Sequence, residues 1–581
     1  MSLPIGLEEA LAAIRAGTPL EGVHLHELDL SGRDLSTARL RGARLSRVDL
    51  HGARLAGLDL AGVDMIDCDL TGADLSGAKL AAARVAMGVW RGANLAGADL
   101  VRARLAQADL RDADLTGANL EGAAIVRCDL GKAKLCAVDA QKTSFEESKL
   151  EATDWRRARL REVTAVRADL RAADLREVSM VKVLLVQANL SGADLDGATL
   201  DTVALTGADL RGARLPRALK NVVLDEAKLG AWAGGGGAEM KETSIAGASL
   251  DGIDLSDAVL DGCSLREVSL RGADLRRASL VRSSFVGCDL EGARLDGAVV
   301  ESAVFHKASL RSVDLSGRHL KLCIFKDADL SGAKLVATKL DVCVLDGAAL
   351  LGADLTDAAI VSGTMRGAAL SRAVVTRTRF ERVDFESVDL TGVSLQGLSL
   401  QRCRFNGLDL ANRDFTGCDL SEAGFESAQL SGARFDGARL RAANFKKARA
   451  DRASFKSARA KGCFFGEADL RLAHLEKAAL EGASFARADL SSARLDGASL
   501  RRARFDRANA RAASFAGADL TYACLPHADV TDGDFTRANL TRASLHATTD
   551  TGAVYLLANL LGVQRTDDAL LAAEAFTPPS T

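Results

Sequence analysis

Residues 91–95 read RGANL, and the same five-residue pattern returns as TGADL at 71–75, SGADL at 191–195 and RGADL at 271–275. Each of these copies ends on leucine, with Asp or Asn directly before it and alanine before that. The composition fits a copied unit, because aromatic residues make up only 4% of the 581 residues and proline occurs 6 times. The chain is therefore predicted to use one short repeat many times over.

Leucine or phenylalanine holds almost every fifth position, first from Leu25 to Leu215 and again from Ile245 to Leu545. On an α-helix, steps of five would scatter these residues around the axis, and on a straight strand they would alternate between faces. They can all point inward only if the chain turns a corner once per unit. We therefore expect a coil of short sides, with glycine favoured at the corners, as at Gly72.

The phenylalanines of the second block indicate how many sides the coil has. Of sixteen at central positions, ten share one position modulo twenty, and five share the position ten residues away. This distribution predicts a four-sided coil of twenty residues, in which rings stack on rings of neighbouring coils. The ten are Phe285, Phe305, Phe325, Phe385, Phe405, Phe425, Phe445, Phe465, Phe485 and Phe505, and the five are Phe415, Phe435, Phe455, Phe515 and Phe535.

These units resemble the A-(D/N)-L-x-x repeats of the pentapeptide-repeat family, and the resemblance spans both blocks. It implies an all-β fold, a right-handed quadrilateral β-helix solenoid with four pentapeptides per coil. The terminal sequences add short capping helices to this expectation. We expect an N-terminal capping helix in 1–19, repeat block 1 in 20–215, a Gly-rich interruption or loop in 216–239, repeat block 2 in 240–548, and a C-terminal cap or helix with a tail in 549–581.

Nine of the eleven cysteines lie two residues before a central residue, in a slot otherwise filled mostly by Ala, Val or Ser. We expect them to pack as small buried apolar residues. Because the sequence has no CxxC pair and no Cys/His cluster at zinc spacing, we predict no disulfide, no metal and no cofactor. The nine are Cys68, Cys128, Cys263, Cys288, Cys323, Cys343, Cys403, Cys418 and Cys463.

The 75 basic and 78 acidic residues give a formal net charge of −3, so the whole chain attracts neither nucleic acid nor an anionic membrane. The N-terminal segment carries Glu8, Glu9 and Arg15 within its apolar stretch and lacks a signal-peptide core. The sequence contains no apolar run long enough to span a bilayer. We therefore expect a cytoplasmic protein without membrane contact.

The sequence offers no catalytic constellation. His24, His26 and Glu27 lie together, but a zinc-protease spacing would need a histidine where Leu30 stands. Serines occur singly, without the GxSxG elbow of hydrolases. We predict that the chain is not an enzyme, and an enzyme with a site in the 216–239 loop is the remote alternative.

Seven aspartates share one side of the first block. The family resemblance implies a structural role, because Asp or Asn is common in this slot of the repeat. The functional alternative is DNA mimicry, as in relatives that bind DNA gyrase, although those are typically short and strongly acidic. The seven are Asp29, Asp49, Asp69, Asp109, Asp129, Asp169 and Asp209.

Two outward-facing groups are candidate interaction surfaces. Val304, Ile324 and Val344 lie on three consecutive coils, and Val299 lies on the adjoining side. An exposed apolar ladder marks a contact surface, although β-branched residues also simply favour strands. Residues 436–461 are strongly basic and could be a solvated face or a docking site for an acidic protein. Nucleic acid is disfavoured, because no set of stacking aromatic residues accompanies the basic patch. The patch consists of Arg439, Arg441, Lys446, Lys447, Arg459 and Lys461.

Taken together, these features predict a non-catalytic rigid scaffold or adaptor that presents a long β-helical surface to protein partners. The tandem blocks after a short helical start look similar to pentapeptide regions found with bacterial type VI secretion apparatus, which suggests an adaptor in secretion. The alternative is a DNA-mimicking modulator of DNA gyrase. A homodimer through a terminus or an apolar side is also consistent with the sequence.

Overall fold

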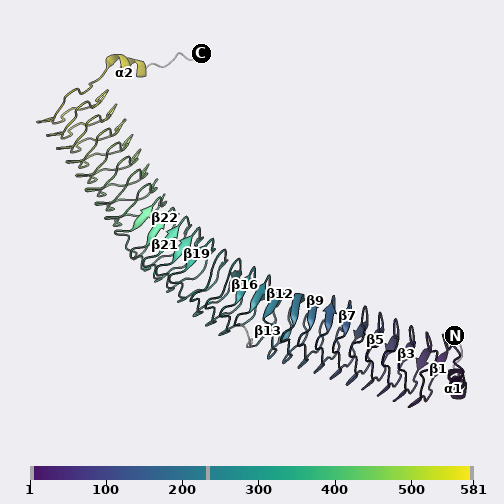
Figure 1. Cartoon of the computed structure of the whole chain (residues 1–581). Coiled ribbons are helices and arrows are strands. Elements are labelled where there is room, and N and C mark those ends of the chain that lie inside the picture. The colour runs from purple at the N-terminus through teal and green to yellow at the C-terminus, as the bar shows by residue number, and fades with distance from the viewer. Residues whose placement is uncertain (1–4, 231–235, 576–581) are drawn as a thin grey trace, which may run out of the picture. The chain divides into compact units, whose positions relative to one another are not determined.

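The computed structural model describes residues 5–230 and 236–575. The chain divides into two compact units, one up to Val299 and one from Val300 onward. Within each unit the chain winds as a parallel β-solenoid, in which each coil stacks on the one before it (Figure 1). The predicted fold, all-β with four pentapeptides per coil and a short helix near each end, is confirmed.

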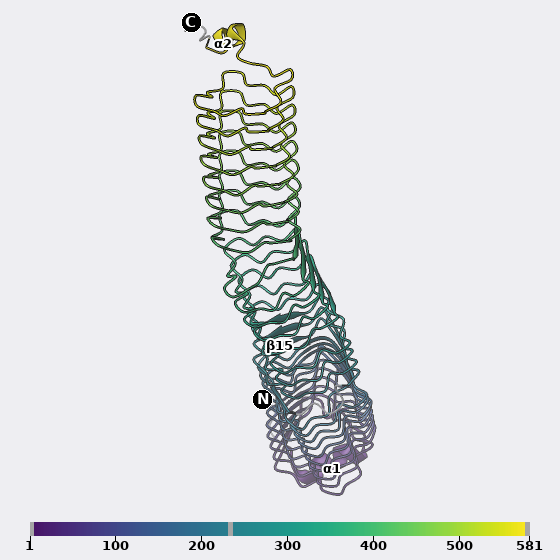
Figure 2. The same ribbon diagram turned by 90° about the vertical axis from the view of Figure 1, so that its left-hand side faces the viewer.

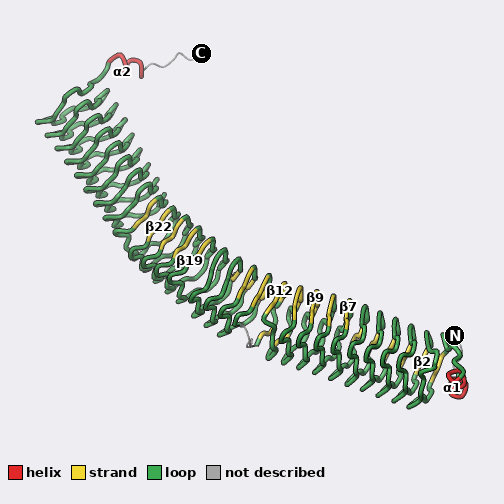
Figure 3. The backbone as a smooth tube through the Cα atoms, in the orientation of Figure 1, coloured by secondary structure: helices red, strands yellow, loops and turns green. Residues whose placement is uncertain are grey.

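The strands are short, and turns and loops make up most of the backbone (Figure 3). Among the described residues, the first unit contains three parallel sheets and the second contains one. The first sheet holds β1 (His24–His26), β2 (Arg44–Ser46), β3 (Asp64–Ile66), β4 (Arg84–Ala86), β5 (Arg104–Ala106) and β6 (Ala124–Val126). The second holds β7 (Asp139–Gln141), β8 (Arg159–Arg161), β9 (Ser179–Leu184), β10 (Thr199–Ala204), β12 (Ala218–Val223), β14 (Glu239–Lys241), β15 (Ser244–Ala246), β16 (Val259–Asp261), β17 (Ser264–Arg266) and β18 (Ser284–Val286). The third holds β11 (Asp209–Leu210) and β13 (Lys228–Leu229), and the sheet of the second unit holds β19 (His319–Lys321), β20 (Lys339–Asp341), β21 (Ala359–Val361), β22 (Arg379–Glu381) and β23 (Ser399–Gln401).

A residue pairs with the one twenty positions further on, as Leu25 does with Leu45. Beyond β23 the ladders continue as single bridges, and the coils of the second unit stack regularly in Figure 2. The central residues are buried, and so are the small residues two positions before them, including the nine cysteines. The twenty-residue coil predicted from the phenylalanines is therefore confirmed.

The phenylalanine rings stack between coils, as expected. Phe435 lies between Phe415 and Phe455, with centroids 4.9 Å from each and planes tilted by only 3° and 5°. Phe445, on the opposite side of the coil, meets Phe435 edge-on at 5.5 Å and 89°. Stacked and edge-to-face pairs are both favourable arrangements of aromatic rings, and they form an unbroken series in the core from Phe380 to Phe535.

The backbone geometry at each corner explains why glycine, aspartate and asparagine recur around the central residue. The residue three positions before it almost always adopts φ between +51° and +74°, which favours glycine, as at Gly72. The side chain directly before the central residue caps the following corner, because Asp69 Oδ1 accepts a hydrogen bond from the Thr71 amide at 2.8 Å. Asn94 accepts one from the Ala96 amide in the same way, at 3.1 Å. Asp and Asn recur in the repeat because they satisfy this amide.

The two short helices lie near opposite ends of the chain. Helix α1 (Leu7–Arg15) buries Ala10, Leu11 and Ile14 against the first coil and so caps it. Helix α2 (Asp568–Glu574) has Asp567 as its N-cap, whose carboxylate accepts hydrogen bonds from two helix amides, but the helix buries no side chain. Neither helix in the described part of the chain has the length and apolar character needed to cross a membrane.

The interruption expected at 216–239 is mostly part of the solenoid. Strand β12 pairs with β10 one residue out of the usual register, with Leu219 opposite Leu200. The register returns when Met240 pairs with Leu219, which adds one residue. A shortened coil followed by a lengthened one thus absorbs the phase shift, and both lie inside the first unit. Trp232 and the first two glycines of the run lie outside the described residues.

The repeat also continues beyond residue 548. Val554, Asn559 and Gln564 pair with residues of the preceding coil, so one more coil precedes α2.

Candidate interaction surfaces

The apolar ladder of the second unit is assembled as the sequence indicated. Val304 pairs with Ile324, and Ile324 pairs with Val344, so the three side chains lie in one column on consecutive coils. Ile324 is exposed, and the two valines are partly exposed. Val299 is exposed as well, and it belongs to the first unit.

The structure adds two residues that the sequence analysis missed. Leu322 and Val342 are exposed at successive corners directly beside the column, with 46% and 47% of their surface accessible. Repeat periodicity assigned outward apolar residues only to the position before the central residue, so these corner positions were overlooked. We call Val304, Leu322, Ile324, Val342 and Val344 the apolar ladder.

Two residues of the apolar ladder have an unfavourable backbone conformation. Leu322 has φ 56° and Val342 has φ 54°, both in the left-handed region. Val342 is the only valine or isoleucine with positive φ among the described residues. A β-branched side chain is disfavoured there by steric clash, so this residue costs folding free energy at a position where glycine would not. Charged pairs border the ladder, including Lys321 with Glu301 at 3.1 Å.

The basic residues do not form one patch. The backbones of Arg439 and Arg459 form a β-bridge between consecutive coils on one side of the solenoid, and Arg441 and Lys461 lie at the corners that follow. Lys446 and Lys447 lie after Phe445, on the next side. Three of the six are near carboxylates. Arg439 lies 3.6 Å from Asp419, Arg441 lies 2.9 Å from Glu422, and Lys447 lies 3.9 Å from Glu467. This arrangement is typical of a solvated surface with local ion pairs rather than of one concentrated cationic site.

The acidic column is present, and its carboxylates are engaged within the solenoid. Each of the seven aspartates accepts a hydrogen bond from the backbone amide two residues on. Arg111 also pairs with Asp109 at 2.6 Å and holds the pKa of that carboxyl well below its usual range. Arg171 and Arg211 pair in the same way with Asp169 and Asp209. The column therefore caps corners and is partly neutralised, unlike the phosphate row of DNA.

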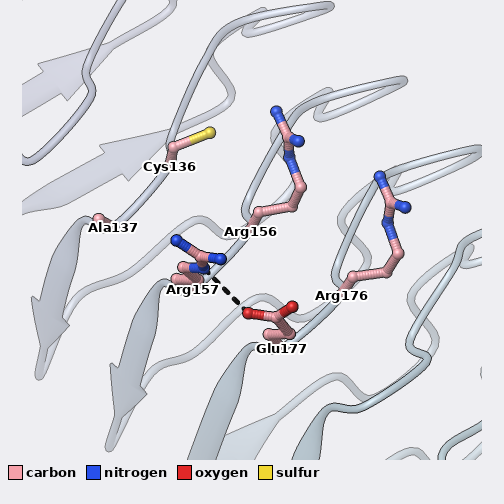
Figure 4. Close-up of a pocket in the computed structure, with 6 residues that line it drawn as sticks. All are labelled: Cys136, Ala137, Arg156, Arg157, Arg176 and Glu177. Atoms are coloured by element: carbon pink, nitrogen blue, oxygen red, sulfur yellow. Dashed lines mark hydrogen bonds and ion pairs between the residues drawn. The ribbon is translucent and has the colours of Figure 1, made fainter.

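One surface hollow of about 420 Å³ contains a cysteine (Figure 4). Burial, and then the nearby Asp154 carboxylate, raises the pKa of Cys136 to about 11, so the thiol stays protonated at neutral pH and is not an activated nucleophile. The guanidinium groups around it are already paired, for example Arg157 with Glu177 at 2.9 Å. The hollow is lined by Cys136, Ala137, Arg156, Arg157, Arg176 and Glu177.

A second hollow, of about 450 Å³, borders the interruption. Its described lining residues include Ser249, Asp251 and Asp254 but no His, Cys or Lys. A hydrogen bond from Ser269 lowers the pKa of Asp251, which suits a permanently ionised carboxylate and not a general acid. This hollow gives no support to the remote enzyme alternative.

The geometry defines a class: a four-sided β-solenoid with a filled core, whose described outward side chains form ladders along its sides. Family models of pentapeptide repeats agree with this class. The chain belongs to the pentapeptide-repeat family. Models of the repeats match 18–57, 43–81, 91–124, 139–177, 184–219, 238–277, 283–317, 323–358, 468–507 and 498–537, and a model of a pentapeptide repeat region matches 378–455.

Solved structures of this family resemble the chain over shorter lengths. A pentapeptide repeat protein from the Arabidopsis thaliana thylakoid lumen is 28% identical over 17% of this chain and 69% of its own, with a TM-score of 0.17. HetL of Nostoc sp. strain PCC 7120, described as involved in heterocyst differentiation regulation, is 24% identical over 52% of this chain and 98% of its own, with a TM-score of 0.14. QnrB1, a plasmid-mediated fluoroquinolone resistance protein, is 18% identical over 42% and 91%, with a TM-score of 0.18. No curated protein sequence gives a match.

Proposed function

We propose that this protein is a non-catalytic scaffold that binds a protein partner through the side walls of its solenoid. The observation that carries the proposal is the apolar ladder, above all Val342. This residue is exposed, apolar and held in the left-handed region, so it improves neither solubility nor folding free energy. Burial of the ladder against a partner would compensate for that cost.

The alternative of DNA mimicry has weaker support. The acidic column is interrupted by Val89, Lys149 and Asn189, and its carboxylates are occupied by amides and arginines. The formal charge of −3 over 581 residues gives no field like that of a nucleic acid. We therefore favour a protein partner that recognises apolar side chains.

Mutation of the ladder tests the proposal. The variants Leu322→Lys and Ile324→Lys place a charge on the surface without touching the core. The matched control is Leu472→Lys, because Leu472 is also exposed, also at a corner, and has φ 58°. Partners captured from the native cell with the wild-type chain should be lost with the ladder variants and kept with the control. An unchanged set of captured proteins with Leu322→Lys and Ile324→Lys would refute the proposal.

We also propose that the C-terminal end of the solenoid binds a second copy of the chain. No coil in the described part of the chain covers the last one, and Leu557 and Leu561 are 71% and 72% exposed. The N-terminal end is already closed by α1, so head-to-tail growth is blocked and a symmetric pair of C-terminal ends is the arrangement that covers the open edge.

A further inference from the structure

Three potential metal ligands meet beside the last coils. His527 and His546 come from consecutive coils, and Glu574 is the last residue of α2. Glu574 Oε2 lies 2.8 Å from His527 Nε2 and 3.4 Å from His546 Nε2. Among the described residues this is the only group of three or more His, Cys, Asp or Glu side chains arranged to hold a metal ion, with ligand atoms within 4.8 Å of one another.

We propose that His527, His546 and Glu574 bind a divalent first-row metal ion such as Zn²⁺, which anchors helix α2 to the solenoid. Two imidazoles and one carboxylate are ligands that Zn²⁺ accepts readily. The proposal is independent of the partner proposed for the apolar ladder, because α2 and the ladder do not share a residue.

The spacing of the Glu574 and His546 ligand atoms suits this ion. Tetrahedral bonds of about 2.1 Å separate neighbouring ligand atoms by about 3.4 Å. The distance from Glu574 Oε2 to His546 Nε2 already has this value, at 3.4 Å. The shorter contact to His527 has to open by about 0.6 Å, and both His527 and Glu574 are on the surface and free to adjust.

The hydrogen bonds that His546 makes in the structure show which contacts would change when a metal ion binds. The amide of Asp567 donates to His546 Nδ1 at 3.2 Å, so neutral His546 carries its proton on Nε2 and donates it to Glu574. Metal binding at Nε2 moves that proton to Nδ1 and displaces the Asp567 amide. Because Asp567 is the N-cap of α2, loading also shifts the start of the helix.

Helix α2 needs an anchor of this kind. It has only seven residues and buries no side chain, and helices of this length are marginal in water. Its last turn carries the acidic Glu574 and no basic residue, which is unfavourable at the negative end of the helix dipole. A cation at this end reverses that interaction. A neighbouring hollow of about 520 Å³, lined in part by His527, Leu571 and Glu574, leaves room for water as a fourth ligand.

The test uses the full-length chain, treated with a chelator and then titrated with Zn²⁺ by calorimetry and with Co²⁺ by absorption. We expect one Zn²⁺ per chain and the visible bands of tetrahedral Co²⁺. Glu574→Gln and His527→Ala should each weaken binding by at least about tenfold. Hydrogen exchange of the α2 amides should slow on addition of Zn²⁺ to the wild-type chain only.

The matched control is His24→Ala, which removes one ring of the only other close histidine pair outside this site in the described chain, with centroids 5.5 Å apart. It should bind Zn²⁺ as the wild type does. Absence of saturable Zn²⁺ binding would overturn the proposal. Binding that persists unchanged in Glu574→Gln and His527→Ala, or that His24→Ala abolishes, would overturn it as well. Glu574 and His527 are exposed enough that these variants fold, so a loss of binding reports on the site.

Discussion

Two buried tryptophans in the core differ in whether their indole N–H groups are hydrogen-bonded. Trp90 is fully buried and, among the described residues, its indole Nε1 has no hydrogen-bond partner. Gly88 occupies the slot two residues before it, where a Cβ would lie 2.8 Å from that Nε1. Trp155 is also buried, but its Nε1 donates to Thr153 Oγ1 at 2.8 Å. Burial of the unpaired Trp90 N–H therefore costs folding free energy, whereas the Trp155 N–H is compensated by its hydrogen bond.

This contrast predicts different effects of the same substitution. Trp90→Phe removes an unsatisfied N–H, so it should change the free energy of unfolding by less than about 1 kcal/mol. Trp155→Phe loses a satisfied hydrogen bond and should be more destabilising by about 2 kcal/mol. Urea unfolding of the two variants measures the difference. Equal destabilisation by both substitutions would show that indole hydrogen bonding does not matter here.

Acid should weaken the corner ion pairs. Arg156 lowers the pKa of Asp154 to about 2 from an ordinary value of 3.8. A carboxyl whose pKa is lowered by folding stabilises the protein above its unfolded pKa, and this contribution disappears as pH falls toward the folded pKa. We expect the free energy of unfolding to drop between about pH 4 and about pH 2, and Asp154→Asn to reduce that drop. Denaturant titrations at a series of pH values test this, and an identical slope in the variant would contradict it.

At the scale of the element, the stability of each coil depends mainly on its contacts with the two neighbouring coils. Phe435 contacts stacked rings in the coils above and below and edge-on rings from the opposite side of the coil. Phe435→Ala should cost about 3–5 kcal/mol, because it leaves a cavity in this stack. Faster hydrogen exchange should appear first in the coils around residues 415–455. Uniform loss of protection, extending equally to the first unit, would contradict a nearest-neighbour account.

The coil was predictable from sequence, but its irregular places were not. A period of five allows only a cornered coil, and the phenylalanine positions gave its four sides. The break after Pro216 resembled a loop, because a phase shift in sequence does not show whether backbone pairing continues at a new register. Leu322 and Val342 were missed because corners were expected to carry glycine or polar residues. The grouping of His527, His546 and Glu574 depends on where α2 packs, which no spacing in the sequence reveals.

At the scale of the whole molecule, the two ends of the chain differ in what they expose. Helix α1 covers apolar residues, whereas the last coil leaves Leu557 and Leu561 exposed. We expect the protein to be a dimer at micromolar concentration, and Leu557→Lys with Leu561→Lys to make it a monomer. Light scattering coupled to size-exclusion chromatography measures this. A wild-type chain that stays monomeric at all concentrations would disprove the pairing of C-terminal ends.

We propose that the protein binds its partner through the apolar ladder on the side of the solenoid, and one measurement tests this most directly. A photo-crosslinking amino acid is placed at Ile324 in one variant and at the control position Leu472 in another, and both are irradiated in the native cell. The account predicts a discrete crosslinked protein at Ile324 that Leu322→Lys abolishes, and none at Leu472. No crosslink at Ile324, or the same products at both positions, would contradict it.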